Sequence, residues 1–195
     1  QEDDQKKGVS SPIILPDIAI LDPELTINLP SDITAATGID AMVHAIEAYT
    51  STNQNNNPIS KFLAIESLKL LGTSIETAVF DGQNIEARSN MLLGSMMAGQ
   101  AFANSPVSAV HALAYPIGGI FHISHGLSNS LVLPHVIRFN SINTEACENY
   151  AFLAPFIFKD IKLNTNSQII CNEFIDRLEN LSSLLNIPSK LRDLD

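Results

Sequence analysis

Apolar side chains recur every three or four residues along most of this chain, and this spacing constrains its fold more than any other feature. One run holds Phe62, Ile65, Leu68, Leu71, Ile75 and Val79. A later run holds Ile170, Phe174, Leu178, Leu181 and Leu185. Side chains so spaced share one face of a helix, and glycine and proline fall between the runs, where helices stop. We expect helices over 33–49, 61–80, 86–104, 107–115, 125–139, 144–158 and 167–186, with a last turn after Pro188.

The predicted fold class is therefore all-α, a bundle-like helical domain with at most one short strand near the N-terminus, at Ile18–Leu21. Residues 1–13 are polar for most of their length, and we interpret them as a tail or as the remnant of a removed domain. The chain does not begin with methionine, which favours a piece of a longer protein. The helical domain is expected to span 14–195.

Composition narrows the class of protein. Apolar residues make up 45% of the 195 positions, which excludes a disordered chain. No apolar run reaches the roughly 18 residues of a membrane-spanning helix. The formal net charge of −10 argues against nucleic acid and against a membrane surface as partners, since both require a basic face. Cys147 and Cys171 belong to no pairing motif, which favours a reduced, cytoplasmic protein. The oligomeric state stays open, a homo-oligomer included.

The helix expected over 33–49 carries few ionisable groups. Besides Tyr49 they are Asp40, His44 and Glu47, whose spacing puts them on one face. A helix that is apolar elsewhere all round is expected to be buried, and a buried carboxylate and imidazole need a partner or a metal. On these residues alone, a buried Asp–His hydrogen bond, a metal-binding pair and an exposed polar face all remain open.

Four of the five histidines lie between His111 and His135. His111 falls in an apolar helix, and His125 begins the next helix after a turn at Gly118-Gly119 that would fold one helix back beside the other. Together with Asp40 and His44 they would supply one carboxylate and three imidazoles. That set suits Fe²⁺ or Zn²⁺ and is too rich in nitrogen for Mg²⁺ or Ca²⁺. On these residues alone, a helical metal-dependent hydrolase and a non-catalytic helical interaction domain are among the functions that such a set allows.

Two segments carry a resemblance to the iron-containing (group III) alcohol dehydrogenases. Residues 34–49, TAATGIDAMVHAIEAY, resemble the first signature of that family. The second family signature is similar to two stretches of this chain: HALAYPIGG, which starts at His111, and HGLSNSLVLPHV, which starts at His125. The stretches 15–25 and 187–194 extend the similarity over about residues 14–195. Two long signatures in the right order form a far more specific match than a single motif.

The resemblance implies a two-domain, NAD- or NADP-dependent dehydrogenase acting on a small alcohol or aldehyde. Its N-terminal α/β domain would hold the nicotinamide cofactor, and its helical C-terminal domain, of the type shared with dehydroquinate synthase, would hold the metal. By position, the metal ligands fall on Asp40, His44, His111 and His125, with Fe²⁺ or Zn²⁺ as the ion. Ile33 falls on a position that contacts the cofactor. The metal would activate the alcohol oxygen, and hydride would pass to the nicotinamide.

The sequence departs from the family pattern in two ways. The glycine-rich segments that cradle the cofactor's phosphates are absent, and the family's last helices are missing. We therefore expect a metal-binding domain that is incomplete at its C-terminus and inactive alone. In addition, Tyr115 stands four places after His111, where several relatives carry histidine. Its hydroxyl could exchange a proton in catalysis, or its ring could simply pack.

Overall fold

A computed structural model describes residues 11–163 and 166–194 of the chain. Within these residues the chain forms α-helices and short 3₁₀ turns and no strand, so the all-α prediction is confirmed. The helices are α1 Ser31–Thr50, α2 Pro58–Phe80, α3 Ile85–Asn104, α4 Ala109–Ile120, α5 His125–Asn140, α6 Thr144–Ile157 and α7 Ser167–Leu184. The 3₁₀ turns are η1 Pro12–Ile14, η2 Pro23–Thr26 and η3 Leu191–Asp193.

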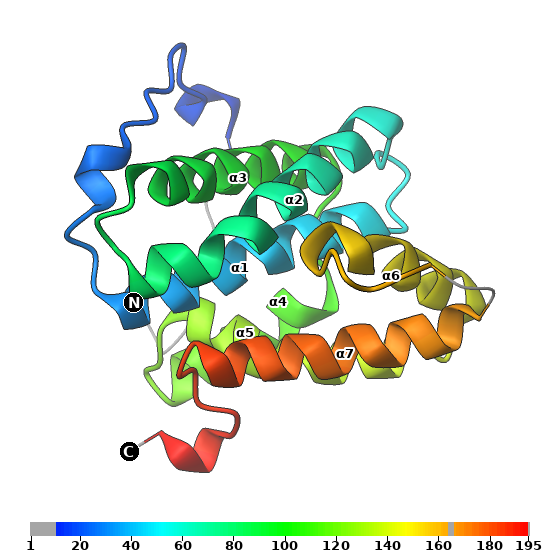
Figure 1. The fold of residues 1–195 in the computed structure, drawn as a ribbon. Helices are drawn as coiled ribbons and strands as arrows, with labels where there is room; N and C mark the ends of the chain where they lie inside the picture. Colours follow the sequence, from blue (N-terminus) through cyan, green and yellow to red (C-terminus); the bar gives the residue numbers. More distant parts are fainter. Residues whose placement is uncertain (1–10, 164–165, 195) are drawn as a thin grey trace.

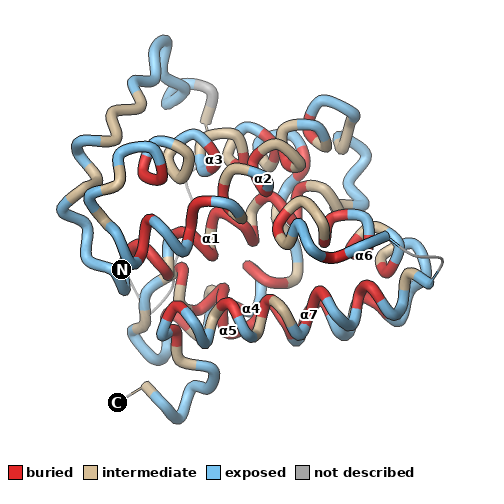
Figure 2. Tube along the Cα trace, viewed as in Figure 1, coloured by how far each residue is buried: buried red, intermediate tan, exposed pale blue. Residues whose placement is uncertain are grey.

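Helix α1 is the centre of the fold. It lies between a layer formed by α2 and α3 and a second layer that contains α4, α5 and α7, with α6 bridging the two at one end (Figure 1). Most of its length is buried (Figure 2). The small side chains of Ala35, Ala41, Ala45 and Ala48 are nearly inaccessible and let neighbouring helices approach closely. The prediction of a buried helix in this position is confirmed, so its polar side chains need partners inside the protein.

The start of α1 is tied down by a buried arginine. Arg88 in α3 is 3% exposed and donates hydrogen bonds to the Thr34 hydroxyl, at 2.8 Å, and to the carbonyl oxygens of Gly82 and Leu29, at 2.9 and 3.2 Å. The helix begins at Ser31, two residues before the predicted start, and Pro30 occupies the N-cap position. The guanidinium therefore joins the segment before α1 to the beginning of α3.

The predicted end of the fourth helix was wrong. We expected Pro116 and Gly118-Gly119 to stop it near Tyr115, but α4 continues through all three to Ile120. Proline removes one N–H and so one hydrogen bond. Ala112, whose carbonyl that N–H would have reached, is exposed, so water can satisfy the oxygen. The chain reverses instead at His122, which has the left-handed φ of 55°.

Other predictions concern helices α5 and α7, the short strand, the N-terminal tail and the two cysteines. Helix α5 runs through Pro134, and the predicted apolar stripe of α7 is buried along its whole length. No regular strand forms at Ile18–Leu21. Of the predicted tail 1–13, residues 1–10 lie outside the described part, and the division at residue 14 stays a prediction. Cys147 and Cys171 are buried free thiols. In the described ranges, no helix is both long enough and apolar enough to cross a membrane.

Candidate metal centre

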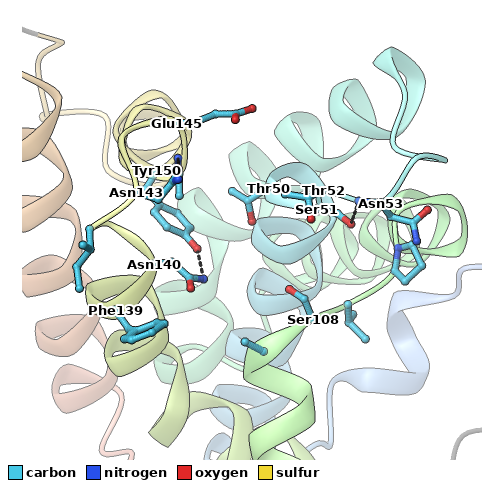
Figure 3. Close-up of a pocket in the computed structure, with 15 residues that line it drawn as sticks. Thr50, Ser51, Thr52, Asn53, Ser108, Phe139, Asn140, Asn143, Glu145 and Tyr150 are labelled. Atoms are coloured by element: carbon cyan, nitrogen blue, oxygen red, sulfur yellow. Dashed lines mark hydrogen bonds between the residues drawn. The ribbon is translucent and has the colours of Figure 1, made fainter.

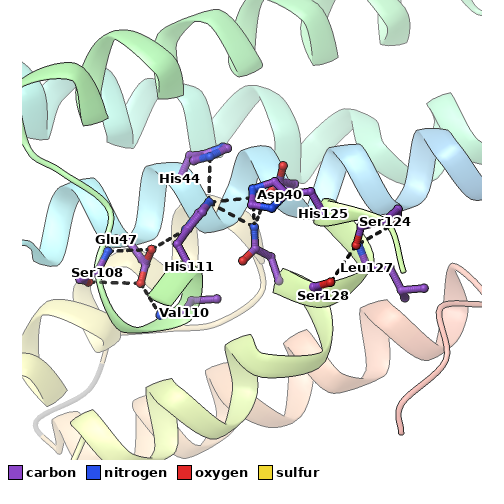
Figure 4. Close-up of polar contacts among 11 residues, drawn as sticks. Asp40, His44, Glu47, Ser108, Val110, His111, Ser124, His125, Leu127 and Ser128 are labelled. Carbon is purple, nitrogen blue, oxygen red and sulfur yellow. Dashed lines mark hydrogen bonds and ion pairs between the residues drawn. The ribbon is translucent and has the colours of Figure 1, made fainter. Parts of the chain in front are cut away.

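The four predicted ligands come together at one point. Asp40 and His44 extend from α1, His111 from α4, and His125 from the first position of α5 (Figure 4). One ligand atom from each side chain lies within 4.8 Å of all the others. The His111 side chain is only 2% exposed, that of Asp40 is 16% exposed and that of His125 is 34% exposed. The cluster is therefore closed on the side of α4 and reachable on the side of α5.

The spacing of the donor atoms is close to what a small cation requires. Nε2 of His111 lies 2.9 Å from Nε2 of His44. Oδ1 of Asp40 lies 3.8 Å from Nε2 of His111 and 3.8 Å from Nε2 of His125. Ligand atoms around a tetrahedral zinc with bonds near 2.0–2.1 Å stand roughly 3.3 Å apart. These three separations differ from that value by about half an ångström or less.

A buried carboxylate fixes the orientation of His111. Oε2 of Glu47, which is 3% exposed, accepts the Nδ1 hydrogen of His111 at 2.7 Å. The same carboxylate accepts hydrogen bonds from the backbone N–H of Val110 at 2.7 Å and of Ser108 at 3.0 Å, and from the Ser108 hydroxyl at 3.2 Å. Because the hydrogen of His111 is held on Nδ1, the lone pair is left on Nε2, which faces the other ligands. The sequence placed Glu47 on the helix face of Asp40 and His44 but did not identify His111 as its partner.

Electrostatics keep the imidazole of His44 neutral. Burial lowers the pKa of His44 to about 4; Asp40 opposes this shift, and His111 and His125 reinforce it. For Glu47, burial acts against ionisation, but the hydrogen bonds from His111 and from the backbone of Ser108 and Val110 outweigh it and lower the pKa. At neutral pH the cluster thus combines a neutral His44 with an ionised Glu47, and a neutral imidazole is the form that binds a metal.

Close packing between α1 and α5 brings His125 to the cluster. Gly126 follows His125 and lies against the backbone of α1, where a Cβ added to it would stand 2.4 Å from the carbonyl oxygen of Ala36. Only a residue without a side chain permits this approach. Ala36 is one helical turn before Asp40. The glycine therefore allows the first turn of α5 to meet the face of α1 that carries the ligands.

Two further predicted site residues lie at different distances from the cluster. The ring of Tyr115 stacks on His125, with 5.5 Å between centroids, and meets His111 edge-on at 6.1 Å. Ile33 is 40% exposed in the first turn of α1 and stands seven residues, about 10 Å along the axis, before Asp40. Tyr115 thus borders the cluster, whereas Ile33 lies on the exposed surface at the end of the same helix.

Sequence reasoning missed one residue of this site. Asn129 is not among the predicted site residues, but its side chain is completely buried and points at the ligands. Its Nδ2 lies 2.5 Å from Oδ1 of Asp40 and 3.1 Å from Nε2 of both His111 and His125. The available signal was its position four residues after His125, which puts both on one face of α5.

A cavity of about 930 Å³ opens between the end of α1, the segment before α4, and the α5–α6 connection (Figure 3). None of the four predicted ligands lines it. Its polar wall includes Tyr150, whose hydroxyl accepts a hydrogen bond from Asn140 at 3.0 Å. It also includes Ser108, which binds Glu47. One residue therefore separates this cavity from the carboxylate that orients His111.

Comparison with known proteins gives a consistent result. Residues 34–195 match the model of the Fe-containing alcohol dehydrogenase family, C-terminal part. The chain is 48% identical over 134 residues to long-chain-alcohol dehydrogenase 1 of Geobacillus thermodenitrificans. The match covers 69% of this chain and 33% of that protein. It is 38% identical over 180 residues to 1,3-propanediol dehydrogenase of Citrobacter freundii, covering 92% of this chain and 45% of the relative.

Solved structures agree with the sequence matches. The crystal structure of a 1,3-propanediol oxidoreductase superimposes with a TM-score of 0.82 at 36% identity, covering 89% of this chain and 44% of that one. An iron-containing alcohol dehydrogenase of Thermococcus thioreducens gives 0.83 at 31% identity, covering 96% of this chain and 46% of that one. This chain thus spans between a third and a half of the length of these proteins.

Proposed function

The chain belongs to the Fe-containing alcohol dehydrogenase family, and on that premise we propose that Asp40, His44, His111 and His125 together bind one divalent cation, Fe²⁺ or Zn²⁺. The cation would form the alcohol-oxidising site of an NAD- or NADP-dependent dehydrogenase. The single observation that carries the proposal is the convergence of one donor atom from each of the four side chains, all within 4.8 Å of one another. The segments that resemble the two family signatures supply these four residues.

The donor set fits such a cation. Three imidazoles and one carboxylate are ligands that iron and zinc accept, whereas Mg²⁺ and Ca²⁺ prefer oxygen. A metal-binding histidine usually donates its second ring N–H to a carboxylate or a carbonyl, and Glu47 receives that hydrogen from His111 at 2.7 Å. The pKa of His44, lowered by burial to about 4, leaves its ring neutral at physiological pH.

When bound, the cation supplies Lewis acidity toward the oxygen of an alcohol or of a carbonyl group. The residues of the chain do the rest. Asp40 contributes a negative charge, and Glu47 keeps the lone pair of His111 directed inward. The partly exposed His125 leaves a side through which a small molecule can enter. Buried His111 shields the opposite side from water.

Tyr115 and Ile33 have proposed roles at the edge of this site. The tyrosine ring stacks on His125, so its hydroxyl is placed to exchange a proton with a molecule bound beside that ring. Ile33 offers an exposed apolar side chain on the helix that carries Asp40 and His44, where it could lie against the nicotinamide. The nicotinamide itself would accept or give hydride and would be bound mainly outside this chain.

A small alcohol or aldehyde is the proposed substrate class. Among the relatives are a 1,3-propanediol dehydrogenase, and an NAD-dependent methanol dehydrogenase of Bacillus methanolicus that is 35% identical over 190 residues. Family membership favours a dehydrogenase over the helical hydrolase and over the non-catalytic interaction domain. The ion, the cofactor type and the individual alcohol are the finer parts of the proposal.

Calorimetric titration of the metal-free chain with Zn²⁺ tests the site. We expect one ion per chain, and we expect His111→Ala to abolish tight binding while the helical circular dichroism signal is kept. His135→Ala is the matched control, since His135 is an exposed histidine on α5 away from the cluster. Equal binding by His111→Ala and by the unaltered chain would overturn the proposal.

A further inference from the structure

The proposed ligand set does not explain the contacts of Asn129. Its side chain is 0% exposed, and its Oδ1 is the only buried side-chain nitrogen or oxygen among the described residues that has no hydrogen-bond partner. Buried polar atoms are nearly always paired, because an unpaired one costs about 1–3 kcal/mol. The oxygen therefore needs a partner that the protein itself does not provide.

The nitrogen end of the same amide has more possible acceptors than it has hydrogens. Nδ2 carries two hydrogens but faces three ligand atoms, on Asp40, His111 and His125, at 2.5, 3.1 and 3.1 Å. Since Glu47 holds the hydrogen of His111 on Nδ1, the Nε2 atom of that ring presents a lone pair to the amide. The –NH₂ group thus lies against three of the four proposed ligands, beside the point where a cation would lie.

A cation beside the amide would reverse the orientation that the amide prefers. It would take up the lone pairs that now accept the amide hydrogens, and it would repel the positive end of the amide dipole. Half a turn about the Cβ–Cγ bond exchanges Nδ2 and Oδ1 with little change in shape. After that turn the oxygen faces the cation, and the attraction between them offsets the cost of leaving the –NH₂ group in the buried pocket.

We propose that Asn129 is a fifth residue of the metal site: its –NH₂ group lies against the ligand atoms of Asp40, His111 and His125 in the metal-free protein, and its amide oxygen faces the cation in the loaded protein. The inference rests on the proposed function and deepens it by adding a ligand to the four that the family resemblance implies. The role proposed for Asn129 is in binding the ion, and the residue affects any reaction only through that binding.

The test compares Zn²⁺ affinity, measured by chelator competition, across variants of the whole chain. Asn129→Ala removes both ends of the amide, whereas Asn129→Asp keeps an oxygen in the same place and removes the hydrogens. Ser128→Ala is the matched control, because Ser128 is also completely buried on α5 but bonds to the backbone of Ser124 at 2.9 Å, away from the cluster (Figure 4). The Tm of each metal-free variant is recorded alongside.

We expect Asn129→Ala to raise the Kd for Zn²⁺ at least tenfold, which is the range for residues that support a metal site. Asn129→Asp should bind at least as tightly as the unaltered chain, and its Tm should rise more on adding Zn²⁺, because the ion relieves the repulsion between two neighbouring carboxylates. Ser128→Ala should leave the Kd unchanged. If Asn129→Ala does not fold, the Asn129→Asp comparison carries the test.

Two results would overturn the inference while leaving the proposed function intact. The first is a Kd for Asn129→Ala within twofold of the unaltered chain, with or without a fall in the Tm of the metal-free protein. The second is equal weakening in Asn129→Ala and Asn129→Asp, which would assign the role to the amide hydrogens. Absence of Zn²⁺ binding by the unaltered chain would overturn the proposed function itself, and the inference with it.

Discussion

Glu47 and His111 form a buried pair in which the carboxylate oxygen accepts the Nδ1 hydrogen at 2.7 Å, and neither side chain is more than 5% exposed. The two residues come from different helices, α1 and α4. The contact therefore joins α1, which carries Asp40 and His44, to α4, which carries His111. It links the geometry of the candidate metal centre to the stability of the fold.

Replacing Glu47 with alanine should lower both stability and metal affinity. The change leaves the donors of His111, Ser108 and Val110 without their acceptor, and a buried donor left unsatisfied costs about 1–3 kcal/mol. Urea unfolding of the metal-free chain measures this loss. Chelator competition should show a Kd for Zn²⁺ raised by roughly 10- to 100-fold. Glu148→Ala, an exposed glutamate on α6, is the control and should change neither quantity.

Gly126→Ala should separate α5 from α1. The new Cβ would stand 2.4 Å from the carbonyl oxygen of Ala36, so the helices must move apart and carry His125 away from Asp40. We expect a loss of about 1–3 kcal/mol and weaker Zn²⁺ binding. Gly99→Ala is the matched control, because an added Cβ there meets nothing within 4 Å. It should stabilise α3 by about 0.5–1 kcal/mol. Equal effects of the two substitutions would contradict the packing argument.

Arg88→Met should destabilise the start of α1 without removing the metal ligands. It abolishes the hydrogen bonds to Thr34, Gly82 and Leu29 and leaves their oxygens without this donor. The expected cost in urea unfolding is about 2–3 kcal/mol, while one Zn²⁺ per chain should still bind. Arg138→Met changes an arginine that is 52% exposed and should cost far less. A similar cost at both positions would show that the buried contacts do not stabilise the fold.

The two cysteines should be unreactive in the folded chain. Burial, reinforced by Cys147, raises the pKa of Cys171 to about 12, and the thiolate is the reactive form. Iodoacetamide should label neither thiol at pH 8 until urea unfolds the chain. Because the pKa of Cys171 is raised on folding, its contribution to stability is complete below about pH 9, the ordinary thiol pKa, and is lost progressively above it. The stability difference between the unaltered chain and Cys171→Ala should therefore shrink from pH 8 to pH 10.5.

The sequence allowed most of the fold and the central ligands to be predicted, because both depend on local patterns. The apolar stripe of α7 and the Asp40–His44 spacing are set by the helical repeat. The continuation of α4 past Pro116 could not be predicted, since the exposure of Ala112, whose carbonyl loses its helical partner, follows from how the helices pack.

The residues that contact the ligands could not be predicted from the sequence either. The partner of Glu47 was missed because 64 residues separate it from His111. Asn129 was missed because it stands 89 residues from Asp40. Such contacts between distant segments follow from helix packing and not from spacing along the chain.

The central claim is that three imidazoles and a carboxylate bind one cation, and X-ray absorption at the zinc edge of the Zn²⁺-loaded chain tests it most directly. We predict a first shell of nitrogen and oxygen at about 2.0–2.2 Å, with outer-shell scattering from three imidazole rings. A shell containing sulfur near 2.3 Å, or scattering from fewer than three imidazoles, would contradict the account.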